Sequence, residues 1–142
     1  MNFHQSEIEI SSNKRGFVLI TDIIVDRISV ISNYKIGILH LFIKHTSASL
    51  AINENADPTV RIDMEEHFNH MVPENAPYYR HTLEGVDDMP AHIKSTIIGN
   101  TLSIPILNGQ LNIGTWQGIY LCEHRSLPHQ RKIVATIYGE LK

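Results

Sequence analysis

The stretch TLSIPILNGQLNIG, residues 101–114, decides the fold class of this chain. Asn108-Gly109 at its centre is a strong hairpin signal, because both residues tolerate the positive φ that a two-residue turn requires. Strands joined by such a turn run antiparallel. Alternating or apolar segments on both sides of the turn continue the pattern toward the C-terminus. The strand candidates in this part of the chain are 101–106, 110–114, 119–125 and 132–140.

Further strands are predicted in the N-terminal third. Residues 7–11 alternate polar with apolar, which predicts a strand, and residues 17–20 are the predicted pairing partner. A short helix is expected to begin near Thr21-Asp22. The segment 36–45 is apolar on both faces, so we expect it to be covered on both sides, either within the fold or by a partner subunit. Its two rows are Leu39, Leu41, Ile43 and His45 on one face and Ile36, Ile38, His40 and Phe42 on the other.

A second helix begins after Asp57, which can cap it, and Pro58 suits its first turn. One side carries apolar residues at helical spacing, which predicts a stripe that packs into the core. That stripe is Val60, Met64, Phe68 and Met71. Asp63, His67 and His70 share the opposite side, where they form either a solvated polar face or a small metal-chelating group.

A third helix is expected over residues 90–98, with Gly99 ending it and a buried ridge of Met89, Ile93 and Ile97. Its opening turn holds Asp87, Asp88 and His92. The positive end of a helix favours anions and a neutral imidazole, so this turn predicts a ligand histidine beside an anion site. The whole pattern predicts an α+β fold with a largely antiparallel sheet or sandwich and two to three helices.

The composition limits the classes of protein. A chain of 142 residues, 42% apolar and 19% charged, fits one domain over residues 1–142. A formal charge of −3 with scattered basic residues disfavours nucleic-acid binding. No signal peptide and no membrane-spanning run is recognised, so we expect a soluble, cytoplasmic protein. A single cysteine, Cys122, excludes a disulfide framework and a Cys-rich zinc site, and it reads as a small apolar filler.

Three histidines stand at positions that suit a metal-binding pocket: His45, His92 and His124. Neutral imidazole is the commonest metal ligand in proteins. His45 continues an inward-facing row, where a hydrogen-bonded core histidine is the alternative interpretation. On its strand, His124 shares a face with Cys122, whereas Glu123 points to the other side. Replacing His92 or His124 should therefore abolish metal binding, whereas replacing His67 or His70 should not.

Five motifs of the chain resemble those of the YjbQ family: residues 45–50 (HTSASL), 53–58 (NENADP), 79–82 (YRHT), 87–92 (DDMPAH) and 114–125 (GTWQGIYLCEHR). They span most of the chain, in order. The resemblance implies an α+β sheet fold, assembly as a homotrimer and a weak thiamine-phosphate synthase activity. That activity joins a pyrimidine pyrophosphate to a thiazole phosphate.

Carried over to this chain, the resemblance implies three groups of site residues. The expected metal ligands are His45, His92 and His124; the expected catalytic residues are Asp87, Asp88 and Arg125; and the expected substrate-binding residues are Asn53, Asn55, Gln117 and Glu123.

Two functions follow from these residues. The first is an enzyme whose histidines hold zinc, leaving a coordination position that could polarise a phosphate of a small-molecule ligand. Magnesium is the alternative ion, because its oxygen preference suits Asp87, Asp88 and Glu123. The second is a non-catalytic ligand-binding or regulatory module that uses the same pocket. A third hypothesis is that the histidines only hold a trimer together. Ser47 and Ser49 lie near His45, but neither sits in a Gly-x-Ser-x-Gly elbow, so a serine nucleophile is disfavoured.

Overall fold

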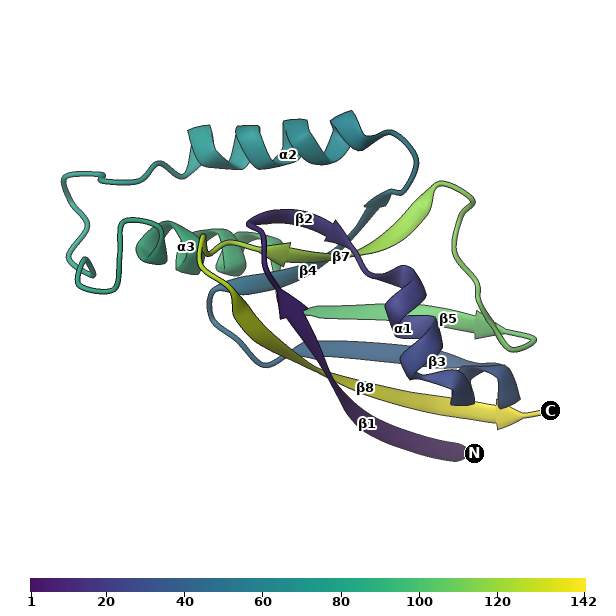
Figure 1. Cartoon of the computed structure of the whole chain (residues 1–142). Helices are drawn as coiled ribbons and strands as arrows, with labels where there is room; N and C mark the ends of the chain where they lie inside the picture. Colours follow the sequence, from purple (N-terminus) through teal and green to yellow (C-terminus); the bar gives the residue numbers. More distant parts are fainter.

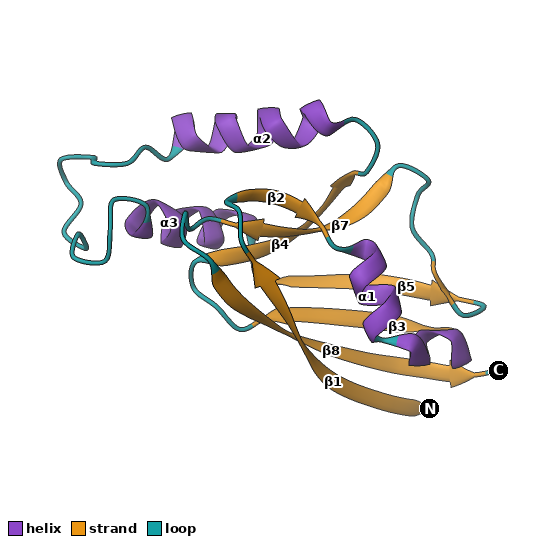
Figure 2. Cartoon of the chain, viewed as in Figure 1, coloured by secondary structure: helices purple, strands orange, loops and turns teal.

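A computed structural model describes all residues, 1–142, and shows an α+β fold in which two antiparallel sheets curl into a half-barrel (Figures 1 and 2). The elements are β1 (Asn2–Ser12), β2 (Gly16–Leu19), α1 (Thr21–Arg27), the 3-10 turn η1 (Ser29–Asn33), β3 (Tyr34–Ile43), β4 (Ala48–Glu54), α2 (Pro58–Met71), α3 (Asp88–Ile98), β5 (Thr101–Leu107), β6 (Gln110–Leu111), β7 (Gln117–Glu123) and β8 (His129–Leu141). The predicted fold class is confirmed.

The two sheets share one apolar core. The larger has the order β1-β8-β3-β5-β6 and the smaller the order β2-β7-β4. Inward-facing residues of both sheets, such as Leu41 of β3 and Leu121 of β7, join one buried cluster with Ile24 of α1. The predicted turn between β5 and β6 is confirmed, with φ values of 50° at Asn108 and 79° at Gly109. Its second strand is shorter than predicted, because β6 ends at Leu111.

The predicted pairing of residues 7–11 with 17–20 is wrong. β1 pairs along its whole length with β8, whereas β2 pairs with β7 in the other sheet. The short connection between β1 and β2 therefore crosses from one sheet to the other. Each strand finds a longer-range partner, which alternation within a strand cannot identify.

Strand β3 is covered on only one face by its own chain. Leu39, Leu41 and Ile43 are almost fully buried, as predicted. On the outer face Ile36 is 54% exposed and Phe42 is 39% exposed. Residue His45 lies beyond the end of the strand and is half-buried, so it does not continue the inward row as expected.

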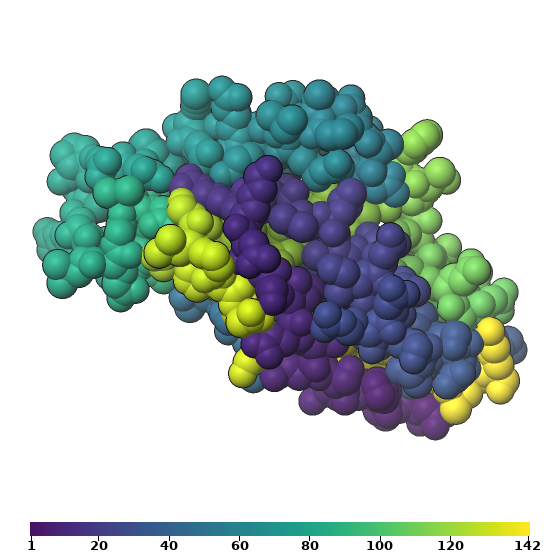
Figure 3. Space-filling view, viewed as in Figure 1, coloured from purple at the N-terminus to yellow at the C-terminus, as the bar shows by residue number.

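Helix α2 begins as predicted, with the Asp57 side chain accepting a hydrogen bond from the backbone N–H of Thr59. The expectation of a fully buried stripe is wrong, because no residue of α2 is buried. Met64 and Phe68 only rest on a small cluster around Phe17 of β2, and Met71 is 49% exposed. Figure 3 shows α2 as the teal band along the top of the molecule, next to the purple N-terminal segment.

Helix α3 buries a different face from the predicted one. Its buried residues are Asp88, Pro90, Ala91 and Lys94, whereas Met89 and Ile93 are half-buried and Ile97 is 53% exposed. The helix packs against β4, and Ser95 donates a hydrogen bond to the carbonyl of Ala48 in that strand. Small and polar side chains fit this close approach, so the apolar ridge turns outward. No helix of the structure combines the length and apolarity that crossing a membrane would require.

Candidate metal centre and polar pocket

Two histidines converge on one carboxylate at the start of α3. The Nε2 atoms of His81 and His92 lie 2.7 and 3.1 Å from Oδ2 of Asp88. The potential ligand atoms of these three residues all lie within 4.8 Å of one another. Asp88 is buried, whereas the two imidazoles are partly open to solvent. The cluster therefore combines a fixed carboxylate with two accessible nitrogen ligands.

The hydrogen bonds of His92 orient its free nitrogen toward the cluster. Its Nδ1 lies 3.0 Å from the carbonyl oxygen of Thr46, which can only accept, so Nδ1 carries a proton and donates it. In the neutral ring Nε2 then has a lone pair, which points at Asp88. A lone pair facing a carboxylate oxygen is unfavourable unless a proton or a metal cation lies between them. This arrangement of a backbone carbonyl behind a ligand histidine is common in metal sites.

Arg125 fixes the acidic side of the cluster. Its Nη1 donates to Oδ1 of Asp88 at 2.7 Å, and its Nε donates to Oδ2 of Asp87 at 3.0 Å. Burial alone would raise the pKa of Asp88, but the hydrogen bond from His81 and the charge of Arg125 outweigh it and hold this pKa below its ordinary value. Asp87, Asp88 and Arg125, the predicted catalytic group, thus lie together in the structure.

His45 borders a polar cavity that also reaches His92. The cavity has a volume of about 340 Å³, and its lining residues are His45, Thr46, His92, Ser95, Thr96 and Asn100. His45 Nε2 accepts a hydrogen bond from the backbone N–H of Lys132 at 2.7 Å. Burial is the largest cause that lowers the pKa of His45, so its ring is neutral with the proton on Nδ1. His45 therefore lies beside the cluster as a hydrogen-bonding group.

His124 does not belong to the cluster. It lies in the protein interior, directly after the last residue of β7. It is 1% exposed, and its Nε2 is 2.8 Å from the hydroxyl of Ser49. Burial, followed by the charge of Lys94, lowers the pKa of His124 to about 3. His45, His92 and His124 are thus not gathered into one ligand group, and of the three only His92 belongs to the cluster with His81 and Asp88.

The predicted substrate-binding residues are dispersed. Glu123 is fully buried and forms a two-pronged ion pair with Arg131, so its carboxylate is not available to a ligand or to magnesium. Asn53, Asn55 and Gln117 lie at the opposite end of β4 and β7 from Ser49 and Glu123. Six residues of extended strand place them about 20 Å from that end. Asn55 there donates to the carbonyls of Thr115 and Gln117 and shapes the turn before β7.

Two polar residues near the site carried no assigned role in the sequence. His81 stands in the YRHT motif, in the connection between α2 and α3, and its position seven residues before Asp88 was the available signal. Lys94 is fully buried, and its ammonium donates to Oδ1 of Asn69 at 2.6 Å. From the sequence alone a lysine at this position of the helix is expected to be solvated, because lysine is seldom buried.

Comparison with known proteins places the chain in a family. The model of the UPF0047 protein YjbQ-like family matches residues 6–140. The chain belongs to this family. It is 54% identical to the UPF0047 protein YjbQ of Salmonella typhimurium over 138 residues, which cover 97% of this chain and 99% of that protein. A UPF0047 protein of Methanocaldococcus jannaschii is 40% identical, with 93% and 92% of the two chains covered.

Solved structures of similar proteins extend the agreement to the fold. A hypothetical protein from Aeropyrum pernix superposes with a TM-score of 0.84 at 28% identity, covering 96% of this chain and 99% of that one. A YbjQ-like protein of unknown function from Sulfolobus solfataricus gives a TM-score of 0.80 at 27% identity, covering 98% and 99%. The two-sheet architecture that positions the cluster is therefore shared with these YjbQ-like proteins.

Proposed function

We propose that this YjbQ-like protein binds a divalent metal ion, zinc in preference to magnesium, through His81, Asp88 and His92. The convergence of both histidines on Oδ2 of Asp88 carries the proposal. Ligand atoms around tetrahedral zinc lie about 3.3 Å apart, given bonds of about 2.0 Å. The His92 contact of 3.1 Å is close to that spacing, whereas the 2.7 Å between His81 and Asp88 would have to widen. Two imidazoles and one carboxylate suit zinc, whereas magnesium prefers an all-oxygen set.

We further propose that a phosphorylated small molecule occupies the cavity between His45 and His92. Its lining contains no apolar side chain. The Nδ1–H of His45 and the amide of Asn100 are donors that suit phosphate oxygens. Bound zinc would supply a positive charge that polarises such an oxygen. Arg125, held by both aspartates, keeps Asp88 in place for this role.

Two functions are candidates for this pocket: catalysis on a bound substrate, and ligand binding without catalysis. Both oxygens of Asp88 already accept hydrogen bonds, Oδ1 from Arg125 and Oδ2 from His81. A carboxylate engaged in this way positions other groups better than it removes protons, which favours the ligand-binding or regulatory module. Thiamine-phosphate synthase chemistry is the catalytic candidate, in which the thiazole nitrogen displaces pyrophosphate from the pyrimidine substrate.

Metal analysis tests the proposed centre. We expect the purified protein to take up about one zinc per chain. His81→Ala and His92→Ala should each weaken zinc affinity about 100-fold or more, because each removes one of three ligands. His67→Ala and His70→Ala, on the exposed side of α2, are matched controls that should bind normally. Loss of zinc in His124→Ala but not in His81→Ala would replace this centre with the three-histidine site.

Zinc-loaded and metal-free protein then distinguish the two uses. Calorimetry with the pyrimidine pyrophosphate and with the thiazole phosphate measures binding, and chromatography of both incubated together measures thiamine phosphate formed. Zinc-dependent product formation supports the enzyme. Zinc-dependent binding without product supports the module, and no binding of either compound contradicts the assignment of the cavity to this ligand class.

We also propose that the protein assembles as a homotrimer through the outer face of β3. Ile36 and Phe42 expose apolar surface there, and the stacked rings of Phe3 and Tyr138 lie on the neighbouring strands beside Ile38. Several large apolar side chains exposed on one face of a sheet are unusual on a monomer. Phe42→Glu should dissociate the assembly, as measured by light scattering. A wild-type mass near one chain would contradict the trimer, and a monomeric variant with full zinc content would place the centre within one subunit.

A further inference from the structure

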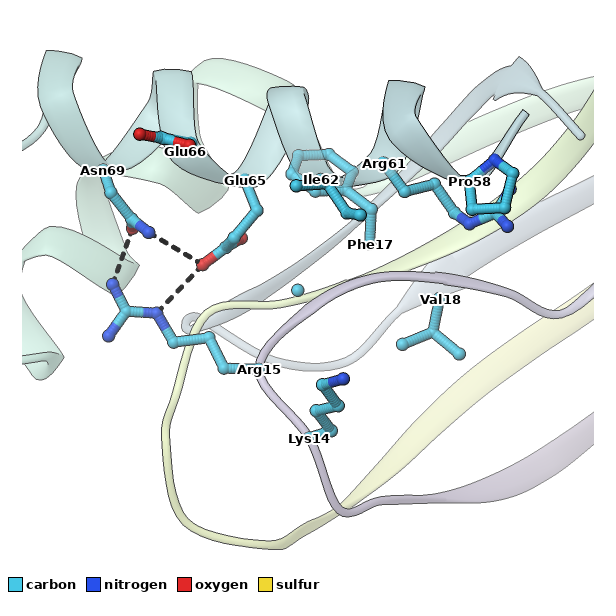
Figure 4. Close-up of a pocket in the computed structure, with 11 residues that line it drawn as sticks. Lys14, Arg15, Phe17, Val18, Pro58, Arg61, Ile62, Glu65, Glu66 and Asn69 are labelled. Carbon is cyan, nitrogen blue, oxygen red and sulfur yellow. Dashed lines mark hydrogen bonds and ion pairs between the residues drawn. The ribbon is translucent and has the colours of Figure 1, made fainter.

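A groove separate from the metal centre runs between α2 and the edge strand β2 (Figure 4). It has a volume of about 460 Å³. On one side it is lined by five consecutive residues, 14–18, and on the other by one face of α2 from Pro58 to Asn69. The eleven helical steps from Pro58 to Asn69 span about 16 Å, at about 1.5 Å each. The groove is therefore long and narrow, with the length of four to five residues of extended chain at about 3.3 Å each.

The strand side of the groove offers an unpaired backbone edge. β2 pairs only with β7. The backbone N–H of Ile20 donates to the carbonyl of Ile119. The backbone N–H and C=O groups of the even-numbered residues in this segment therefore face β7. The N–H and C=O groups of Phe17 and Leu19 therefore point away from β7 in the alternation of an antiparallel pair. Such an edge can add an extended peptide as a further strand.

The helix side offers an unpartnered cation at one end of the groove. Nη1 of Arg61 is shielded from solvent, yet it has no hydrogen-bond partner. The charge of the nearby carboxylate of Asp57 interacts with Arg61, but its Oδ1 accepts from the backbone and hydroxyl of Thr59 and the two residues form no ion pair. In Figure 4 the guanidinium of Arg61 extends toward Pro58, at the N-terminal end of α2. The positive helix end and the arginine together favour a carboxylate at this position.

The other end of the groove carries charges of both signs. Lys14 and Arg15 line it together with Glu65 and Glu66. Arg15 forms an ion pair with Glu65, whose second oxygen, Oε2, is shielded and unpartnered. Between the two ends, the apolar side chains of Val18 and Ile62 are 40% and 61% exposed. The groove thus has an unpaired arginine at the Pro58 end, an apolar middle and mixed charges at the Asn69 end.

We propose that this groove binds an extended peptide of four to five residues as an added strand on β2. The peptide's C-terminal carboxylate pairs with Arg61, and apolar side chains in its middle contact Val18 and Ile62. The mode matches strand addition beside a helix, in which backbone hydrogen bonds supply affinity and the flanking side chains supply selectivity. It involves no residue of the metal centre, so it holds or fails independently of zinc.

A display library of random pentapeptides with free C-terminal carboxylates tests the proposal, screened against metal-free full-length protein. We expect enriched peptides with apolar residues next to the C-terminal carboxylate. When they are synthesised, C-terminal amidation and the variant Arg61→Ala should each weaken binding about tenfold. Lys35→Ala, which removes an exposed cation far from the groove, is the matched control and should leave affinity unchanged.

Amide hydrogen exchange locates the bound peptide. Binding should slow exchange at Phe17 and Leu19, whose N–H groups face outward, and leave Val18 unchanged, because its N–H already faces β7. No enrichment over the Arg61→Ala protein would overturn the proposal. So would enriched peptides that leave both amides unprotected, or protection of Phe17 and Leu19 that rises with protein concentration alone, since the edge would then be covered by a second copy.

Discussion

Glu123→Gln is expected to lower the free energy of unfolding by about 3–5 kcal/mol, because it leaves the buried guanidinium of Arg131 without a counter-charge. Glu123 and Arg131 are 0% and 2% exposed, and two hydrogen bonds join them. The carboxylate of Glu123 also accepts from the backbone N–H of Arg125, which follows the strand and whose guanidinium binds Asp87 and Asp88. Urea denaturation of wild type and variant measures the loss.

An exposed ion pair serves as the control for this variant. Glu7→Gln breaks the contact of Glu7 with Lys44, in which both side chains are largely solvated, and it should leave the midpoint of unfolding nearly unchanged. The double variant Glu123→Leu with Arg131→Leu should be more stable than Glu123→Gln, because it buries no unpaired charge. A loss below about 1 kcal/mol in Glu123→Gln would show that the pair does not have the buried geometry described.

Mild acid is expected to destabilise the fold through His124. Its pKa is about 3 in the folded protein and near 6.5 when unfolded, so below pH 6.5 the unfolded chain takes up a proton that the folded chain does not. This contribution to stability is therefore complete above pH 6.5 and is lost as pH falls toward 3. Between pH 6.5 and 4.5 the loss should be about 2 kcal/mol, at 1.36 kcal/mol per pKa unit.

His124→Gln isolates this effect from other titrating groups. Glutamine does not titrate, and it can retain a hydrogen bond to the hydroxyl of Ser49. The unfolding free energy of the variant, measured by urea denaturation at several pH values, should fall by about 2 kcal/mol less than that of wild type over the same range. Parallel curves of unfolding free energy against pH for the two proteins would mean that His124 takes up its proton in the folded state as readily as in the unfolded chain.

The starting turn of α3 was predictable because its signals are local. Asp87, Asp88 and His92 lie within six residues, and the electrostatics of a helix start can be read from such spacing. Arg125 was expected in the same group from the family motifs, and the structure brings it to both aspartates. His81 was not assigned, because it lies in an irregular connection whose path no periodicity specifies.

Sequence alone determined the elements whose causes are local: the Asn108-Gly109 turn, the Asp57 cap and the inward row of β3. Only the tertiary structure decided the pairing of β1 with β8, the outward turn of the α3 ridge, the burial of Lys94 and the separation of His124 from His92. The physical reason is that alternation fixes which face a side chain takes but not which distant strand or helix covers it. Long-range packing makes that choice, and it placed His81 in the cluster instead of His124.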